Sequence, residues 1–363
     1  MDKLVSKIKL RVPALLNSLY QEHGFFSWSL NHDLYSHSIK WGLANTVFAI
    51  KLYYLLGELT NIPKQQKDDI FTFIKSFQHA DGSFNDPLIY NKTSLLNKLV
   101  AIKHLNFSDF FNHKTIMAET RQAMVALLLL HKKPDKPYQG IPYSRKNLVK
   151  YIKGLHWENA WAAASHVSHE VFFLKMNAQL FAYENHKSKS LIKYCLEAIE
   201  KIQHHTDGMW YVTHTSTKQK VNAAMKMITT CNLLEDPTIP YADKIIDFVL
   251  ASEKENYYCD GCDNLNAIFV LKYAFDSCEK NYRVNDVRTF SERSLNRIEK
   301  YFFEKEGGFS FLSSPFARKL YGLQITHPFK GADIHGTFLL TWAVALATDL
   351  LEMDVGLKSN IIN

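Results

Sequence analysis

The chain has 363 residues, 47% of them hydrophobic, which is enough to bury one large core or two of ordinary size. No stretch reaches the roughly 18 to 20 uncharged apolar residues that a transmembrane helix needs, and the longest apolar run, 338–351, contains Asp349. The net charge of +7 comes from scattered basic residues, which gives no indication of nucleic-acid binding. The same charge permits peripheral contact with an acidic membrane surface or with a phosphate-bearing ligand.

The five cysteines are odd in number and sparse, a pattern that favours a reducing cytoplasm over a disulfide framework. The first five residues begin an amphipathic helix and not the charged and apolar regions of a secretion signal. We therefore expect a cytoplasmic protein.

One short pattern recurs three times along the chain. It reads Gln-His-Ala-Asp-Gly-Ser-Phe at 78–84, Gln-His-His-Thr-Asp-Gly-Met-Trp at 203–210 and Glu-Lys-Glu-Gly-Gly-Phe at 304–309. A glycine followed by a buried aromatic is typical of a helix end, because glycine adopts the left-handed conformation there without strain. Its recurrence predicts repeated helical hairpins.

Apolar residues recur at a spacing of three to four along most of the chain, which predicts helices almost throughout. In chain order, helices with one polar face are expected at 3–19, 68–78, 148–154, 188–203, 241–252 and 289–303. Helices that are apolar nearly all round, and hence buried, are expected at 43–56, 117–130, 160–176, 221–234, 265–275 and 337–351. Alternation of the two kinds predicts an all-α fold, a single domain over 1–363 in which six inner and six outer helices close into an α/α toroid, with 3–19 beside the last inner helix.

The first two copies of the pattern, with their preceding helices, resemble the repeat of squalene and other terpenoid cyclases and of protein prenyltransferase β subunits. This resemblance covers most of the chain and implies an (α/α)6 toroid. It indicates the activity less closely, because the same architecture carries glycan lyases, glycosidases and non-catalytic binding domains. An open helical solenoid is the alternative fold.

In a toroid the amino-termini of all inner helices line one mouth of the central cavity, and their dipoles favour an anion such as a diphosphate or a carboxylate. The chain places unusual polar residues at these positions, although helix capping explains any one of them equally well. They are Glu119, Arg121, Gln122, Trp157, Glu158, Asn159, Lys220, Asn222, Asp260, Cys262, Asp263, Asn264, Asn266, Asp333 and His335.

Asp260, Cys262 and His335 resemble the zinc site of protein prenyltransferase β subunits. Carboxylate, thiolate and imidazole form a three-ligand set that leaves one position of a tetrahedral zinc open for chemistry. The alternative is a capping aspartate beside a buried cysteine. Asp260 and Asp263 also resemble the acidic cluster of protonating terpene cyclases, but the Asp-x-Asp-Asp of those enzymes is absent.

A further polar group lies on the expected helix 160–176 and just before it. Trp157, Glu158 and Trp161 precede His166 and His169, which share one helix face because they are three residues apart. A carboxylate, an imidazole and two indole rings suit acid–base chemistry and the stacking of sugar rings. Both histidines are equally consistent with hydrogen-bonded core residues.

The segment 313–333 is longer than a helix connection requires and is expected to be a loop at the cavity mouth. Arg318, Lys319, Tyr321 and Lys330 would lie at or near this mouth and donate to a phosphate or a carboxylate, or they would be structural. Tyr321 is expected on the cavity wall, and Arg318 or Lys330 on a mobile rim. The sequence thus predicts catalytic roles for Glu158, His166, His169, Asp263 and Asp333. It predicts substrate-binding roles for Arg121, Trp157, Trp161, Arg318, Tyr321 and Lys330.

Three classes of function are consistent with these residues. The first is an enzyme of the prenyltransferase and terpene cyclase superfamily that acts on an isoprenoid or diphosphate-bearing ligand, with zinc as a cofactor. The second is a glycan-active enzyme, and the third is a non-catalytic binding or assembly module. The sequence indicates neither the substrate nor the oligomeric state.

Overall fold

The structure, a computed structural model, describes residues 2–31, 42–87, 89, 113–234, 238–279 and 281–361. Over these ranges it is 60% helical, with twelve helices and two small antiparallel sheets. The prediction of a predominantly helical protein is confirmed. None of the helices in these ranges is long and apolar enough to cross a membrane. The closed toroid stays a prediction.

The internal contacts of the chain define two compact units. Unit 1 comprises Ile141–Lys300 and Trp342–Ile362, and unit 2 comprises Asp2–Gly140 and Tyr301–Thr341. Helix α14 (Ile334–Leu350) contributes its first half to unit 2 and its second half to unit 1. The single domain expected from the sequence stays a prediction.

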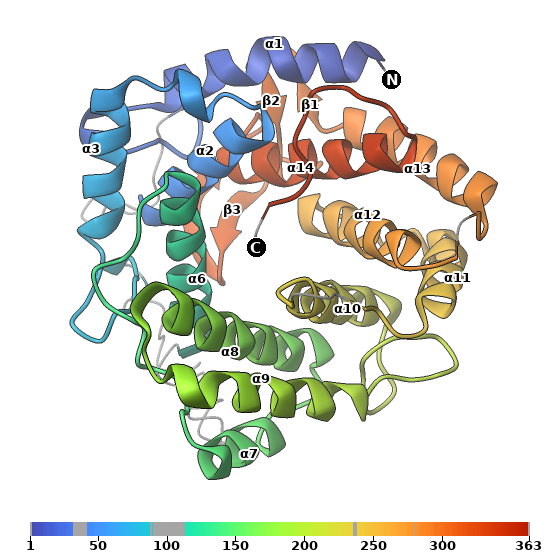
Figure 1. The fold of residues 1–363 in the computed structure, drawn as a ribbon. Coiled ribbons are helices and arrows are strands. Elements are labelled where there is room, and N and C mark those ends of the chain that lie inside the picture. The colour runs from blue at the N-terminus through green and yellow to red at the C-terminus, as the bar shows by residue number, and fades with distance from the viewer. Residues whose placement is uncertain are drawn as a thin grey trace. The chain divides into compact units, whose positions relative to one another are not determined.

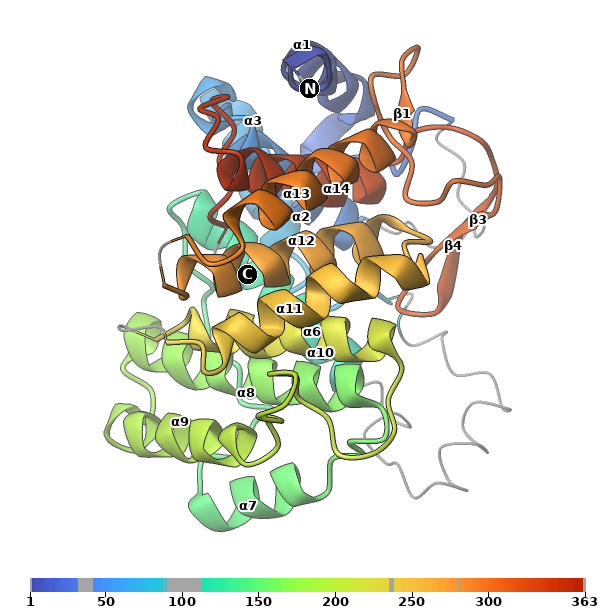
Figure 2. The same ribbon diagram turned by 90° about the vertical axis from the view of Figure 1, so that its right-hand side faces the viewer.

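Unit 1 alternates buried and half-exposed helices. Its elements are α7 (Arg145–Lys153), α8 (Ala160–Phe181), α9 (Asn185–Glu200), α10 (Thr217–Cys231), α11 (Ala242–Ser252), η4 (Glu253–Glu255), α12 (Gly261–Asp276) and α13 (Val284–Glu299). Helix α10 packs against α8 and α12, α9 covers α8, and α11 and α13 cover α12 (Figure 1, Figure 2). The burial follows the sequence pattern, since α9 buries only Ser188, Leu191, Cys195 and Ile199, which are spaced three to four residues apart.

Unit 2 combines helices with the two sheets. Its elements are α1 (Asp2–Leu19), η1 (Glu22–Gly24), α2 (Leu43–Leu55), η2 (Leu59–Asn61), α3 (Lys64–Lys75), α6 (His113–Leu129), β1 (Phe302–Phe303), β2 (Gly308–Phe309), β3 (Ala317–Leu320), β4 (Leu323–Pro328) and the start of α14. The buried α2 packs against α3 and α6, and β2 packs against α1. All twelve expected helices are present in the two units, and their ends differ from expectation by at most five residues, as at the end of α8 and the start of α13.

Four turns of one kind recur in the structure, and each pairs a residue before the turn with an aromatic residue after it. The pairs are Tyr20–Phe26, Gln78–Phe84, Gln203–Trp210 and Phe302–Phe309. Each turn contains a glycine with φ between +70° and +83°, namely Gly24, Gly82, Gly208 or Gly307. Three turns are the copies seen in the sequence. The fourth, Glu22-His23-Gly24-Phe25, lacks the Asp-Gly or Gly-Gly pair by which the others are recognised.

These glycines also allow close packing. A Cβ atom at Gly24 would lie 2.6 Å from the backbone of Asp69 in α3, and one at Gly307 would lie 2.9 Å from Arg11 in α1. The next residue, Gly308, lies between Leu15 of α1 and Thr337 of α14. Strand β2 is therefore flanked by the first helix and by the start of the last one.

The segment 313–333, which the sequence analysis expected to be a loop, contains the β3–β4 hairpin. Leu320 pairs with Leu323 across Tyr321 and Gly322, whose φ angles are +52° and +81°. Two successive residues with positive φ form a tight turn of the kind that matches the twist of a two-stranded ribbon. A residue followed by glycine between two β-prone runs is the sequence signal for such a hairpin.

We predict that Gly82→Ala destabilises the protein by about 3 kcal/mol. A left-handed alanine costs roughly 1 to 2 kcal/mol, and the new methyl group would lie 2.0 Å from the carbonyl oxygen of Pro137, an overpacking worth about 1 to 3 kcal/mol more. Gly57→Ala is the matched control, because Gly57 has φ of +75° but no neighbour within 4 Å. Chemical denaturation measures both. Equal losses in the two variants would contradict the packing role.

Candidate functional site

Unit 2 contains a recess between α2, α6 and the tip of the β3–β4 hairpin. Its volume is about 210 Å³, counting the part that is open to solvent. It is lined by Leu43, Ala44, Val47, Phe48, Glu119, Gln122 and Tyr321. An apolar floor with a few polar groups is the usual composition of a small-molecule site.

Helix α2 provides the apolar floor because residues spaced three to four apart, Ala44, Val47, Phe48 and Lys51, share one helix face. Lys51 is fully buried. Its ammonium group donates to Gln122 Oε1 and lies 5.3 Å from the centroid of the Phe338 ring. A buried lysine normally requires such partners, because an unpaired charge loses its hydration. Gln122 therefore joins the floor of the recess to the wall formed by α6.

Helix α6 also holds the turn at 78–84. Glu119 is 2% exposed, and its Oε2 accepts a hydrogen bond from the backbone N–H of Asp86. The Thr120 hydroxyl accepts from the N–H of Phe84 and donates to the carbonyl of Ile116. Glu119 thus places a carboxyl group on the recess wall and at the same time fixes the chain after the turn.

Aromatic rings surround His335 next to the recess. The imidazole is stacked on Phe48 and on Phe311, with centroid distances of 4.8 and 4.6 Å, and Trp28 lies at 5.8 Å. Within the described part of the chain, the buried Nδ1 of His335 has no hydrogen-bond partner. Burial lowers the pKa of His335 to about 3. The ring is therefore neutral at pH 7.

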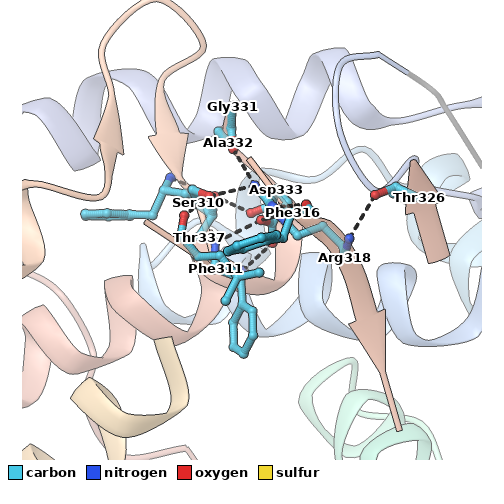
Figure 3. A network of polar contacts seen from close by, with 12 residues as sticks. Ser310, Phe311, Phe316, Arg318, Thr326, Gly331, Ala332, Asp333 and Thr337 are labelled. Atoms are coloured by element: carbon cyan, nitrogen blue, oxygen red, sulfur yellow. Dashed lines mark hydrogen bonds and ion pairs between the residues drawn. The ribbon is translucent and has the colours of Figure 1, made fainter. Parts of the chain in front are cut away.

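A buried ion pair links the hairpin to α14 (Figure 3). Arg318 Nε lies 2.7 Å from Asp333 Oδ2, and the two side chains are 1% and 0% exposed. The guanidinium also donates to the carbonyl of Phe316 and to the hydroxyl of Ser310. Such saturation with hydrogen bonds is what allows an ion pair to be buried.

Asp333 has further hydrogen-bond partners in the backbone of Phe311 and Gly336, and Figure 3 shows the network around Phe311 and Asp333. Its Oδ1 accepts from the N–H of Gly336 in the first turn of α14, and its Oδ2 accepts from the N–H of Phe311. One carboxylate therefore fixes the hairpin through Arg318, the backbone of Phe311, and the start of the helix that carries His335.

The predicted site residues of unit 2 differ in burial. Arg318 is buried in the ion pair and not on a mobile rim, and Asp333 is its partner. Arg121 is 3% exposed, and burial lowers its pKa to about 9. Lys330 is exposed. Tyr321 does line the recess, so the structure brings it together with Phe48, the neighbour of His335. The roles of these residues stay predictions.

The predicted acidic residues in unit 1 lie at the start of α12. Asp260 caps this helix, since its Oδ1 accepts from the N–H of Asp263. This is the capping role that the sequence analysis gave as the alternative to a zinc ligand. Asp263 Oδ2 accepts from Lys218 Nζ at 2.8 Å and from the N–H of Cys259. Burial raises the pKa of Asp263, and the nearby Asp260 raises it further.

The predicted sugar-binding group is dispersed around the start of α8. Glu158 is 73% exposed at its side chain and lies 3.9 Å from His156. Trp157 and Trp161 are half-buried. His166 Nδ1 is 2.7 Å from the Tyr151 hydroxyl, and His169 is buried. His166 thus has the partner that a hydrogen-bonded core histidine requires.

The zinc hypothesis stays a prediction. Burial raises the pKa of the Cys262 thiol, which disfavours the thiolate that a metal needs. His335 belongs to unit 2 and is stacked between two phenylalanine rings, whereas Asp260 and Cys262 belong to unit 1. Over the ranges that the structure covers, no group of three or more His, Cys, Asp and Glu side chains is arranged to hold a metal ion.

Comparison of the chain with protein-family models, with curated proteins and with solved structures finds no significant match. The geometry of the sites is therefore the only basis for assigning a function.

Several buried polar residues were not predicted as site residues. Lys51 is the one charged residue of α2, and that isolation is the signal that could have identified it, whereas Glu170 lies in α8 together with Lys175, His166 and His169. Glu170 is fully buried, and neither carboxyl oxygen has a partner among the described residues. Burial raises its pKa well above the usual value.

We predict that His335→Phe removes a pH dependence of stability. Unfolded histidine binds a proton near pH 6.5, whereas His335 in the fold does so only near pH 3. Between these values only the unfolded state is protonated, so the free energy of unfolding falls as the pH is lowered, by up to about 1.4 kcal/mol per unit. Denaturation from pH 7 to pH 4 should show a shallower decline for His335→Phe than for the wild type or for His205→Gln, an exposed-site control. Parallel curves for all three proteins would argue that His335 is not held neutral.

Proposed function

We propose that the protein binds an apolar ligand of the isoprenoid class, with its apolar part in the recess of unit 2. The observation that carries this proposal is the composition of the recess, in which four apolar residues of α2 face Tyr321 and only two polar side chains, Glu119 and Gln122. Burying a hydrocarbon against such a floor gains roughly 25 cal/mol per Å² of apolar surface.

The charges around the recess favour an uncharged polar end on the ligand. Glu119 brings a carboxyl group to the wall, and the buried cation Lys51 is already bonded to Gln122. A diphosphate would meet the carboxylate at close range in a medium of low dielectric constant, where like charges repel strongly. An alcohol could instead accept from or donate to Gln122 and Glu119. We therefore favour an isoprenoid alcohol or hydrocarbon over a diphosphate ester.

We further propose that the protein converts this ligand by chemistry of the prenyltransferase or terpene cyclase class. The aromatic rings near the recess support it. Phe48 lines the recess and stacks on Phe338 and on His335, and His335 stacks in turn on Phe311, so a cationic intermediate formed beside Phe48 would lie near a group of π-faces. Product analysis after incubation with isoprenoids, with and without added zinc, tests this part separately from binding.

We predict that Ala44→Leu abolishes ligand binding. Ala44 is 5% exposed on the recess wall, so a larger side chain occupies the ligand volume while it remains among apolar neighbours. Isothermal titration with farnesol should show at least a tenfold loss of affinity, with the free energy of unfolding lowered by about 1 to 3 kcal/mol because the larger side chain overpacks a nearly buried position. Tyr321→Asn provides a second variant, since asparagine tolerates the left-handed turn position and removes only the ring.

Leu10→Ala is the control for these titrations, because Leu10 is a 73% exposed apolar residue on α1, outside the recess. It should bind farnesol like the wild type. Tighter binding of farnesyl diphosphate than of farnesol would overturn the preference for an uncharged end. Binding of oligosaccharides but not of farnesol would overturn the isoprenoid proposal in favour of a glycan-active protein.

A further inference from the structure

Two cysteines with the spacing Cys-x-x-Cys lie at the start of α12 in unit 1. Cys259 precedes the capping residue Asp260, and Cys262 lies in the first turn of the helix. Cys259 is exposed, Cys262 is half-buried, and both thiols are free. The pair thus combines one sulfur that another molecule can reach with a second sulfur held behind it.

Asp263 lies directly against this pair. Its side chain is 0% exposed, and its Oδ2 accepts from the backbone N–H of Cys259 at 3.1 Å and from Lys218 Nζ at 2.8 Å. Its Oδ1 is buried and has no hydrogen-bond partner within the described part of the chain. The residue that follows Cys262 therefore anchors the backbone of Cys259, and its second carboxylate oxygen remains without a hydrogen-bond partner among the described residues.

The surroundings give the two thiols different roles. Burial raises the pKa of the Cys262 thiol, and the carboxylates of Asp260 and Asp263 raise it further, so the exposed Cys259 is the sulfur that reacts first. Lys218 offsets part of this negative charge, since it lies 2.8 Å from Asp263 and 3.9 Å from Asp260. With only two residues between the cysteines, little chain entropy opposes closing the small ring.

We propose that Cys259 and Cys262 form a redox-active pair that exchanges with the disulfide of a thiol-bearing molecule. The Cys259 sulfur attacks one sulfur of the partner disulfide, so that a mixed disulfide forms and the first partner thiolate leaves. The Cys262 sulfur then attacks the Cys259 sulfur, which releases the second partner thiolate and closes the internal disulfide. The two cysteine protons end on the two released thiols, so one disulfide is reduced as another forms.

This activity is independent of the isoprenoid site, since all of its residues belong to unit 1 and the recess belongs to unit 2. Half of a zinc site is the other common use of two cysteines at this spacing. The two roles predict different reactions with an added disulfide. A redox pair forms an internal disulfide, whereas metal-bound thiolates do not react until the metal is removed.

The full-length protein is incubated with mixtures of reduced and oxidised glutathione, quenched by alkylation and analysed by intact mass and non-reducing peptide mapping. We expect a reversible loss of two hydrogen atoms and a cross-link between the peptides of Cys259 and Cys262. Cys262→Ser should instead retain glutathione on Cys259, since the second attack is lost. Cys278→Ser removes another half-buried cysteine and should behave like the wild type.

Two results would overturn the proposal. One is a wild-type protein that carries glutathione on Cys259 without forming the internal bond. The other is a stoichiometric zinc ion, found by metal analysis, whose removal by a chelator is needed before either thiol reacts.

Discussion

The carboxylate of Asp333 accepts hydrogen bonds from three separate parts of unit 2: the guanidinium of Arg318 in β3, the N–H of Phe311, and the N–H of Gly336 in α14. Removing two charges from water costs several kcal/mol per ion, so this ion pair persists only because its polar atoms are almost fully bonded. The ion pair contributes less to the stability of the protein than to the placement of the segments that it connects. It fixes the hairpin that carries Tyr321, the segment that carries Phe311, and the helix turn that carries His335.

The chemistry of the recess follows from that arrangement. Phe311 and Phe48 lie on the two faces of His335, which leaves the imidazole neutral and apolar in character. The floor from α2 is apolar, and its one cation, Lys51, is bonded to Gln122 and lies near the Phe338 ring. This composition is the basis of our proposal that the ligand is largely hydrocarbon and bears little charge.

The helices could be predicted from the sequence because apolar periodicity is a local signal, and the three Gly-aromatic turns because their residues are adjacent in the chain. Two other turns have weaker local signals, in which a glycine marks the turn without the Asp-Gly or Gly-Gly pair. They are the fourth turn, at Gly24, and the hairpin turn at Tyr321 and Gly322. The pairing of Arg318 with Asp333 has no local signal, since it joins residues that the sequence places on a loop and at a helix start. Polar residues at helix starts are also ambiguous in the sequence. Asp260, for example, caps its helix, and it would do so whether or not it has a further role.

Hydrogen exchange of Arg318→Met, followed by mass spectrometry, tests most directly whether the buried ion pair holds the site together. Methionine keeps much of the side-chain volume and removes the charge, and Lys319→Met on the exposed side of β3 is the matched control. The account predicts faster exchange in Arg318→Met at three places together, 309–311, 317–328 and 334–340, with little change in Lys319→Met. Exchange that quickens only within the hairpin, while 309–311 and 334–340 remain as protected as in the wild type, would contradict it.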